Sequence, residues 1–501
     1  MLAKVLTALP HGLQGRLVEV QVDVAAGVPA FIMVGLAGGS VREAKERVRA
    51  AIRNGGRTFP LRKLTVNLAP AGLRKEGAGL DLAIAIGICL ADLGSPSPTA
   101  AAFLGELGLD GRVRHVNGVL VLARSLAAQG VRELFVPEVD AAEAALAGAL
   151  TVIPSPSLGA VLAHLSGGAR LPRFAGGPPA PPHEEWDSDL AEVCGQELAR
   201  RSLEVAASGG HHLLMTGPPG AGKTMLARCL PGLLPPLTLD QALEVTQVRS
   251  VLGELSEGRP LEWRRPFRSP HHSISLAGLV GGGSGLARPG EISRAHRGVL
   301  FLDELAEFKA QTLQALRQPL EQGSVVIIRG GGAVTYPTSF QLVAATNPCP
   351  CGWAGDPARP CRCTPGAVHA YQRALSGPLL DRIDLQVAVP RTPPHALGRE
   401  GGGEPSASVR ERVLAARDLQ LRRQGKLNAA LRAAELRRWA PLEPTARATL
   451  ERWSGERALS ARAFHRAWRV ARTLADMEGA AAVAECHVLE ALGYRLADLA
   501  A

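Results

Sequence analysis

Apolar and polar side chains alternate in short blocks over residues 1–168, and the period of the alternation changes from block to block. In residues 18–24 every second residue is valine and the residues between are polar, which predicts a half-buried strand. The apolar run over residues 80–90 predicts a buried helix. Ser40 and Glu43 have the spacing of a capping box, which predicts a helix that starts at Ser40. We therefore expect a compact α+β domain here.

Two stretches rich in proline, glycine and polar residues divide the chain into three parts. Residues 169–186 include the run GGPPAPP, which propagates neither helix nor sheet, and residues 393–408 form a second break that we expect to be a flexible linker. Between them, residues 187–392 contain apolar runs that end in polar residues, as the strands of an α/β core do. Residues 409–501 are rich in alanine, leucine and arginine and predict a small all-α lid.

The composition is that of a multidomain globular protein. With 501 residues the chain is too long for a single core, and 46% hydrophobic with 20% charged residues exclude the disordered class. The longest apolar run is about half of what a membrane-spanning helix needs, and the N-terminus lacks a signal-peptide pattern. We therefore expect a cytoplasmic protein with no membrane contact. The formal net charge of +10 favours polyanionic partners.

One glycine-rich run has the residues and the surroundings of a phosphate-binding loop. An apolar strand pattern precedes it and a helix pattern follows it, and the loop consists of Gly217, Pro218, Pro219, Gly220, Ala221, Gly222, Lys223 and Thr224. Its glycines let backbone N–H groups converge on phosphate oxygens at the amino end of the helix. We expect Lys223 to contact the β- and γ-phosphates of ATP and Thr224 to ligate Mg²⁺.

Two further apolar segments end in polar residues suited to ATP hydrolysis. Residues 298–302 run directly into Asp303 and Glu304, as in a buried strand that delivers carboxylates to its carboxyl end. We expect Asp303 to hold Mg²⁺ through water and Glu304 to polarise the attacking water. Residues 340–345 lead to Asn347, whose amide would orient that water. An asparagine in an ordinary turn at the end of a strand is the alternative for Asn347.

Four of the eight cysteines lie in one short segment as two C-x-C pairs, Cys349, Cys351, Cys361 and Cys363. In a compartment where disulfides are disfavoured, four thiolates suit tetrahedral Zn²⁺, although gaps of one residue are shorter than the usual two to four. We expect a structural zinc site. Reduced, packed cysteines are the alternative.

A segment rich in arginine and aromatic residues lies between the phosphate loop and the Asp-Glu strand, over residues 263–272. Arg265 and Arg268 beside aromatic residues suit a nucleic-acid backbone with bases stacked next to it. A loop that braces a subunit interface is the alternative. Farther along, residues 325–329 and 334–336 predict a β-hairpin.

Four longer runs are specific enough to indicate a family. They are RPFRSPHH from residue 265, PGEIS from 289, NPCPCG from 347 and SGPLLDRID from 376. These runs resemble the ComM/YifB family of magnesium-chelatase-like AAA+ ATPases. With the N-terminal domain, the resemblance covers nearly the whole chain.

The resemblance implies a homo-oligomeric ring, usually hexameric, in which each ATP lies between neighbouring subunits. Arg382 matches the family's arginine finger, which is supplied in trans, and Arg462 resembles the sensor arginine of the lid. Both would stabilise charge on the transferring phosphoryl group. Taken alone, an arginine between two acids is most often part of a surface salt bridge. Val193 and Gly195 match the family's segment near the adenine.

The family's N-terminal domain is similar in fold to the Lon protease domain, a ribosomal S5 domain 2-like fold. Aligning residues 76–80 with the nucleophile loop of that domain puts Gly79 where the serine belongs. Aligning residues 112–121 puts Leu120 where the lysine belongs. Because a Ser-Lys dyad needs both members, we expect no protease activity.

Two functions remain open at this point. One is a DNA helicase that drives branch migration in homologous recombination of incoming DNA, as in natural transformation. Its partners would be single-stranded or branched DNA and recombination proteins. The other is a protein-remodelling subunit, as in magnesium chelatase. The N-terminal domain and the cysteine loop favour the first, because the chelatase motor subunit is expected to lack both.

Overall fold

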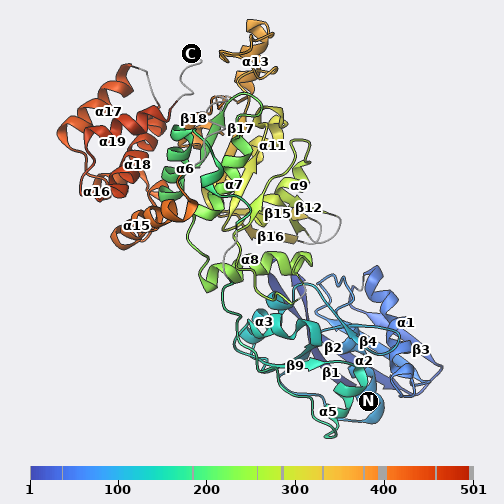
Figure 1. Ribbon diagram of the computed structural model, residues 1–501. Coiled ribbons are helices and arrows are strands. Elements are labelled where there is room, and N and C mark those ends of the chain that lie inside the picture. Colours follow the sequence, from blue (N-terminus) through green and yellow to red (C-terminus); the bar gives the residue numbers. More distant parts are fainter. Residues whose placement is uncertain are drawn as a thin grey trace.

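The computed structural model consists of two lobes (Figure 1). The smaller N-terminal lobe, blue to cyan in Figure 1, lies below a larger lobe that contains the ATPase core and the helical lid. The described residues are 2–36, 38–182, 186–256, 258–283, 287–329, 332–375, 379–392, 403–456 and 460–495. Within these ranges, every helix is too short or too polar to span a bilayer.

A seven-stranded mixed sheet forms the centre of the N-terminal lobe. Its strand order is β3-β4-β2-β1-β5-β8-β9, in which β1 and β2 and then β2 and β4 pair antiparallel and the other neighbours pair parallel. The strands are β1 (Leu2–His11), β2 (Gln14–Ala25), β3 (Ala30–Val34), β4 (Lys63–Ala69), β5 (Ala101–Phe103), β8 (Glu133–Pro137) and β9 (Thr151–Ser155). The other elements of the lobe are α1 (Gly39–Asn54), α2 (Asp81–Leu93), β6 (Glu106–Leu107), β7 (Val113–Arg114), α3 (Val119–Ala128), η1 (Glu138–Asp140), α4 (Ala141–Ala145) and α5 (Leu158–Leu165).

Two predicted elements of this lobe are confirmed and one predicted helix start is wrong. Residues 18–24 lie in β2 with their valines buried, and residues 81–91 of α2 are all buried. Helix α1 begins at Gly39, one residue before the expected capping box, with extended Gly38 as its N-cap. The N–H of Gly38 donates to the carbonyl of Lys75 at 2.8 Å. Ser40 therefore lies inside the first turn of the helix and not at its N-cap.

The larger lobe contains a five-stranded parallel sheet with the strand order β11-β14-β17-β10-β18. The strands are β10 (Leu213–Thr216), β11 (Phe267–Arg268), β14 (Val299–Leu302), β17 (Gln341–Thr346) and β18 (Leu385–Ala388). Because all five are parallel, the loops that follow them meet at one edge of the sheet and the segments that precede them meet at the opposite edge. We call these the carboxyl edge and the amino edge.

The sheet separates two hydrophobic cores. Along β10, Leu213 and Met215 belong to the core that also contains the helices α6 and α7, and Leu214 belongs to the core under the hairpin. The predicted hairpin is confirmed, and its tip at residues 330–331 lies outside the described residues. The elements of these layers are η2 (Leu190–Glu192), α6 (Glu197–Gly209), α7 (Lys223–Leu233), α8 (Leu239–Leu252), α9 (Leu276–Val280), β12 (Gly281–Gly282), β13 (Arg288–Pro289), α10 (Glu291–Arg294), η3 (Leu305–Glu307), α11 (Ala310–Ala315), α12 (Arg317–Gln322), β15 (Ser324–Arg329), β16 (Gly332–Pro337), α13 (Pro365–Leu375) and η4 (Leu380–Arg382).

The lid is helical and packs against α6 and α7 of the core (Figure 1). Its elements are α15 (Ser406–Gln424), η5 (Asn428–Ala430), α16 (Ala433–Trp439), α17 (Pro444–Glu456), α18 (Ala461–Met477) and α19 (Glu485–Gly493). Helix α15 takes in the last residues of the segment expected to be a linker, of which residues 393–402 lie outside the described ranges. The hydroxyl of Ser406 accepts from the N–H of Leu190 at 2.7 Å, and Arg412 pairs with Glu204 at 2.6 Å.

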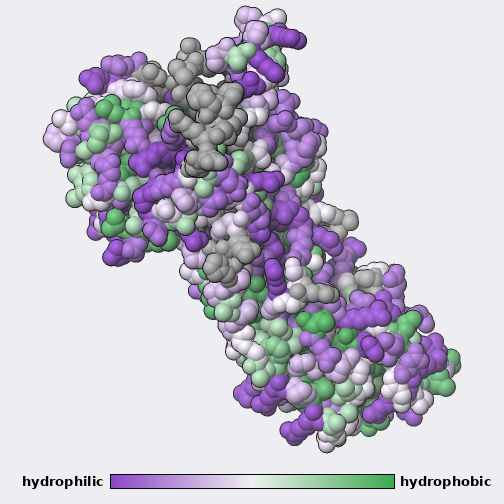
Figure 2. Space-filling model, viewed as in Figure 1, coloured by the Kyte–Doolittle hydropathy of each residue, from purple (hydrophilic) through white to green (hydrophobic). Residues whose placement is uncertain are grey.

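The N-terminal lobe contacts the core at α8 and at the hairpin of β15 and β16. Buried Glu143 accepts hydrogen bonds from the N–H of Leu120 at 2.7 Å and from the hydroxyl of Ser250 on α8 at 2.5 Å. Gly12 lies so close to the hairpin that an added Cβ would stand 2.2 Å from Cγ1 of Val334. Figure 2 shows a mostly polar visible face, with apolar patches over the N-terminal lobe.

Candidate functional site at the carboxyl edge of the sheet

The phosphate loop leaves β10 at the carboxyl edge and enters α7. Gly220 and Gly222 have φ of 75° and 88°, which a residue with a Cβ adopts only under strain. Gly217 lies against the end of β18, where an added Cβ would stand 2.0 Å from the carbonyl oxygen of Val389. The glycines therefore allow a tight turn that ends at the amino end of α7, where backbone N–H groups and the helix dipole favour an anion.

Lys223 lies among oxygen acceptors inside this loop. Its Nζ donates to the carbonyl oxygens of Gly217 at 2.6 Å and Pro218 at 3.0 Å. It also donates to Oδ1 of Asn347, which follows β17, at 3.1 Å. Burial lowers the pKa of Lys223, and two nearby carboxylates oppose part of this shift. Phosphate oxygens that replaced these acceptors would find a buried cation at this position.

The groups expected to hold Mg²⁺ lie next to each other. The hydroxyl of Thr224 donates to Oδ2 of Asp303 at 2.9 Å. Oδ1 of Asp303 accepts from the N–H of Glu304 at 3.0 Å. One hydroxyl and one carboxylate beside the phosphate loop form a donor set of hard oxygens, which is the set that Mg²⁺ takes in nucleotide sites. The residues present therefore fit MgATP.

Glu304 has an unexpected neighbour. Its Oε2 lies 3.0 Å from Nδ1 of His272, and half of its side chain is exposed. The backbone of Glu304 has φ of 51°, a conformation that non-glycine residues rarely adopt. His272 also lies edge-on to Phe308, with ring centroids 6.4 Å apart. No chemical role for His272 was predicted from the sequence, although it ends the RPFRSPHH run.

The segment expected near the adenine lies beside the phosphate loop. Val193 is buried, and Gly195 has φ of 67°. The next residue, Gln196, donates through Nε2 to the carbonyl oxygen of Ala221 at 3.4 Å and to Oγ1 of Thr392 at 3.2 Å. These contacts join this segment to the phosphate loop and to the residues that follow β18.

The two predicted arginines lie at the amino edge, across the sheet from the phosphate loop. Arg382 in η4 and Arg462 in α18 line one cavity of about 670 Å³, together with residues that precede β10 and β17. Arg382 is 11% exposed and pairs with the carboxylate of Glu321. Arg462 is exposed. The structure therefore brings these two arginines together and separates them from Lys223, Asp303 and Glu304 of the same chain.

A third arginine holds this edge together and was not predicted. Arg466 of α18 donates to the carbonyl oxygens of Leu380 at 3.2 Å and Ile383 at 3.3 Å, which flank Arg382. Arg466 is almost fully buried. Its spacing of four residues from Arg462 is the available signal in the sequence, since such residues share a helix face.

The expectation that Arg265 and Arg268 face DNA is wrong. Arg265 is 9% exposed and donates to the carbonyl oxygens of Pro235 at 2.7 Å and Arg297 at 2.5 Å. Arg268 forms two hydrogen bonds with Glu291, at 2.6 and 2.8 Å. Both guanidinium groups are used inside the chain, where they tie the edge strand β11 to its neighbours.

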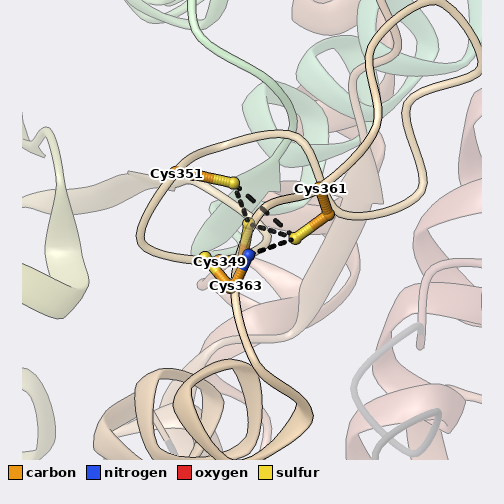
Figure 3. A group of neighbouring side chains, drawn as sticks. All are labelled: Cys349, Cys351, Cys361 and Cys363. Atoms are coloured by element: carbon orange, nitrogen blue, oxygen red, sulfur yellow. Dashed lines mark hydrogen bonds between the residues drawn. The ribbon is translucent and has the colours of Figure 1, made fainter.

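The four clustered cysteines converge in the loop between β17 and α13 (Figure 3). Their four sulfur atoms lie within 4.8 Å of one another, and all four cysteines are free. Thiolate ligands of this number and proximity fit a tetrahedral metal. The loop starts two residues after Asn347, so it adjoins the nucleotide site.

A parallel sheet with a phosphate loop, an Asp-Glu strand and a helical lid defines an AAA+ ATPase of the magnesium-chelatase type. Three family models match the chain: "Magnesium chelatase, subunit ChlI" over residues 189–397, "Subunit ChlI of Mg-chelatase" over 20–140, and "Magnesium chelatase, subunit ChlI C-terminal" over 403–495.

Full-length relatives place the chain more closely. It is 43% identical to the uncharacterized protein YifB of Salmonella typhimurium, over 99% of this chain and 97% of that protein. It is 42% identical to the competence protein ComM of Haemophilus influenzae, over 99% and 97%. The magnesium-chelatase 67 kDa subunit of Chlorobaculum parvum is 25% identical over 32% of this chain and 23% of that protein. The chain belongs to the ComM/YifB family of magnesium-chelatase-like proteins.

Proposed function

We propose that this chain is one subunit of a ring, hexameric in the family's usual form, that hydrolyses ATP to move DNA strands. The observation that carries the proposal is the division of the catalytic groups between the two edges of one sheet. Lys223, Asp303 and Glu304 stand at the carboxyl edge, and Arg382 and Arg462 at the amino edge. A complete site then needs the amino edge of a neighbouring subunit, as in a closed ring with head-to-tail interfaces.

Each residue then has a defined part in hydrolysis. Thr224 and Asp303 would hold Mg²⁺, which would neutralise phosphate charge. Lys223 binds phosphate oxygens, and Glu304 accepts the proton of the attacking water while Asn347 orients it. Arg382 and Arg462 of the neighbouring subunit stabilise the charge that develops on the transferring phosphoryl group, which couples turnover to the subunit interface. All of these roles are part of the proposal.

We favour DNA as the substrate of this motor. The substrate would be single-stranded or branched DNA during recombination of incoming DNA. The formal net charge of +10 suits a polyanion, and one full-length relative is named a competence protein. Arg265 and Arg268 are not part of the proposed DNA contact, since both are paired within the chain. Recombination proteins would be the partners of such a motor.

We also propose that the N-terminal lobe is a Lon-like, S5 domain 2-like domain without protease activity. Its mixed seven-stranded sheet with α2 and α3 supports this assignment. The positions aligned with the catalytic dyad are Gly79 and buried Leu120, and neither side chain is a nucleophile or a base.

The experiment is an ATPase assay of the purified ring with and without single-stranded DNA and three- and four-stranded junctions. We expect faster hydrolysis with DNA, ATP-dependent movement of the junctions, and binding that weakens steeply with salt and depends little on base sequence. Lys223→Ala is the control, because it removes the phosphate contact without changing the surface charge elsewhere. A ring that neither binds these DNAs at low salt nor responds to them would favour the chelatase-like remodelling of a protein partner.

A further inference from the structure

The four sulfur atoms of the cysteine loop have the spacing of a metal site. Sγ of Cys349 lies 3.4 Å from that of Cys351 and 3.7 Å from that of Cys361, and Cys351 and Cys361 are 3.6 Å apart. A tetrahedron with zinc–sulfur bonds of about 2.3 Å has sulfur–sulfur edges of roughly 3.8 Å. A disulfide would need a separation of about 2.05 Å. The spacing therefore matches ligands around one ion.

The loop reaches this arrangement despite its short C-x-C gaps. Gly352 and Gly355 have φ of 83° and 78°, so the chain reverses between the two cysteine pairs and brings them face to face (Figure 3). The N–H of Ala354 donates to Sγ of Cys349 at 3.3 Å, and that of Cys363 donates to Sγ of Cys361 at 3.4 Å. Backbone N–H groups that point at sulfur stabilise thiolates, which are the form that binds zinc.

The cysteine loop packs closely against the phosphate loop. An added Cβ at Gly352 would stand 2.5 Å from Cδ of Pro219, the third residue of the phosphate loop. Asn347, which accepts from Lys223, precedes the first cysteine by two residues. The cysteine loop thus borders the nucleotide site at two points, through Gly352 and through Asn347. Its shape must affect the shape of the phosphate loop, because packed interiors transmit small displacements.

We propose that Cys349, Cys351, Cys361 and Cys363 bind one structural Zn²⁺ and that this ion fixes the loop that supports the phosphate loop. The ion takes no part in hydrolysis. Its role is to hold Gly352 against Pro219 and Asn347 beside Lys223, so that nucleotide binds to a preformed loop. Tight nucleotide binding therefore depends on bound zinc.

Metal content and metal spectroscopy test the site itself. Protein purified without chelators should contain about one zinc per chain, and Cys361→Ser should lose most of it. Cys486→Ser is the matched control, because Cys486 is exposed and outside the cluster. Cobalt substituted for zinc should give the absorption bands of a tetrahedral tetrathiolate. Absence of both bound zinc and these bands would mean that the thiols are only reduced and packed, and would overturn the proposal.

A pair of glycine variants tests the coupling with all four thiols in place. Gly352→Ala and Gly355→Ala carry the same backbone strain, but an added Cβ meets Pro219 at the first position and open space at the second. We expect both to keep zinc, and only Gly352→Ala to weaken binding of a fluorescent ATP analogue, by about tenfold. Equal affinities in the two variants would show that the loop does not support the phosphate loop.

Zinc removal from wild-type protein tests the same coupling when Cys361→Ser does not fold. Chelation should weaken binding of the analogue by a similar factor, and added zinc should restore it. Unchanged affinity after proven removal of the ion would overturn the supporting role. These measurements use no DNA, so their failure would leave the proposed motor function standing.

Discussion

The two edges of the ATPase sheet are built in different ways. At the carboxyl edge, Asp303 and Asn347 directly follow their strands, and Lys223 lies seven residues after the end of β10. At the amino edge, Arg382 comes from the segment before β18, and Arg462 comes from the lid, far away in the sequence. The carboxyl edge is therefore made by the ATPase core, and the amino edge combines residues of the core with residues of the lid. In the proposed ring, hydrolysis at each interface requires the carboxyl edge of one subunit and the amino edge of its neighbour.

The largest expected effect comes from the loss of the Arg382 guanidinium at the amino edge while the carboxyl edge stays intact. Arg382→Ala should lower turnover by about a thousandfold, because a trans arginine supplies charge stabilisation of that size. Nucleotide binding should change little. Steady-state ATPase rates with a separate binding titration measure the two quantities.

Mixed rings distinguish a trans role from a structural one. When Arg382→Ala and Lys223→Ala subunits are combined, some interfaces pair an intact loop with an intact arginine, and these should regain hydrolysis. No recovery, despite proven mixing, would mean that Arg382 serves its own chain through Glu321.

Glu304→Gln is expected to have the next largest effect. It removes the group that accepts the proton of water but keeps Thr224 and Asp303 in place, so ATP should bind while turnover falls by roughly a hundredfold or more. Trapped ATP on the variant, measured after gel filtration, checks the first part. Turnover at the wild-type rate would exclude Glu304 as the base. The carboxyl edge would then not supply the group that accepts the proton of water.

The sequence was informative where chemistry and local pattern coincide. Strands β14 and β17 and the loop after β10 were predicted because an apolar run and its polar end are contiguous. It misled for Arg265 and Arg268, because charge pattern does not reveal a partner such as Glu291, 23 residues away. It did not single out Arg466, because the helix face that Arg466 shares with Arg462 does not show that its guanidinium reaches the carbonyl groups of Leu380 and Ile383.

A smaller effect should come from loosening the lid at the amino edge. Buried His211 lies between Asp384, at 2.9 Å, and Thr473 of α18, at 2.8 Å. Asp384→Asn should lower the free energy of unfolding of the core and lid by about 1–3 kcal/mol, because a buried partner is lost. Urea titrations followed by tryptophan fluorescence measure this. Asp418→Asn is the control, because Asp418 lies on α15 of the lid and pairs there with Arg422, where both side chains are exposed.

The pH dependence of that variant carries a definite sign. Burial by itself would raise the pKa of Asp384, but the hydrogen bond and charge of His211 hold it below its usual value. A carboxyl group with a lowered pKa in the folded state stabilises above its unfolded pKa of about 3.9, and this stability is lost as the pH falls through the folded value. Wild-type protein should therefore lose more stability than Asp384→Asn below about pH 4. Equal losses would remove Asp384 from the docking of the lid.

The smallest expected effect concerns the contact between His272 and Glu304 at the carboxyl edge. His272 holds the carboxylate of Glu304 at 3.0 Å, where both side chains are partly exposed. A pair of this kind is worth up to about 1 kcal/mol, or roughly fivefold in an equilibrium. We expect His272→Ala to free Glu304 for water and to raise basal ATP hydrolysis by at most this factor. His271→Ala is the comparison, because the ring of His271 lies 4.0 Å from that of His272, so this variant removes the ring contact but keeps the His272–Glu304 pair. A fall in basal hydrolysis in His272→Ala alone would mean that the histidine orients Glu304 for catalysis and does not restrain it.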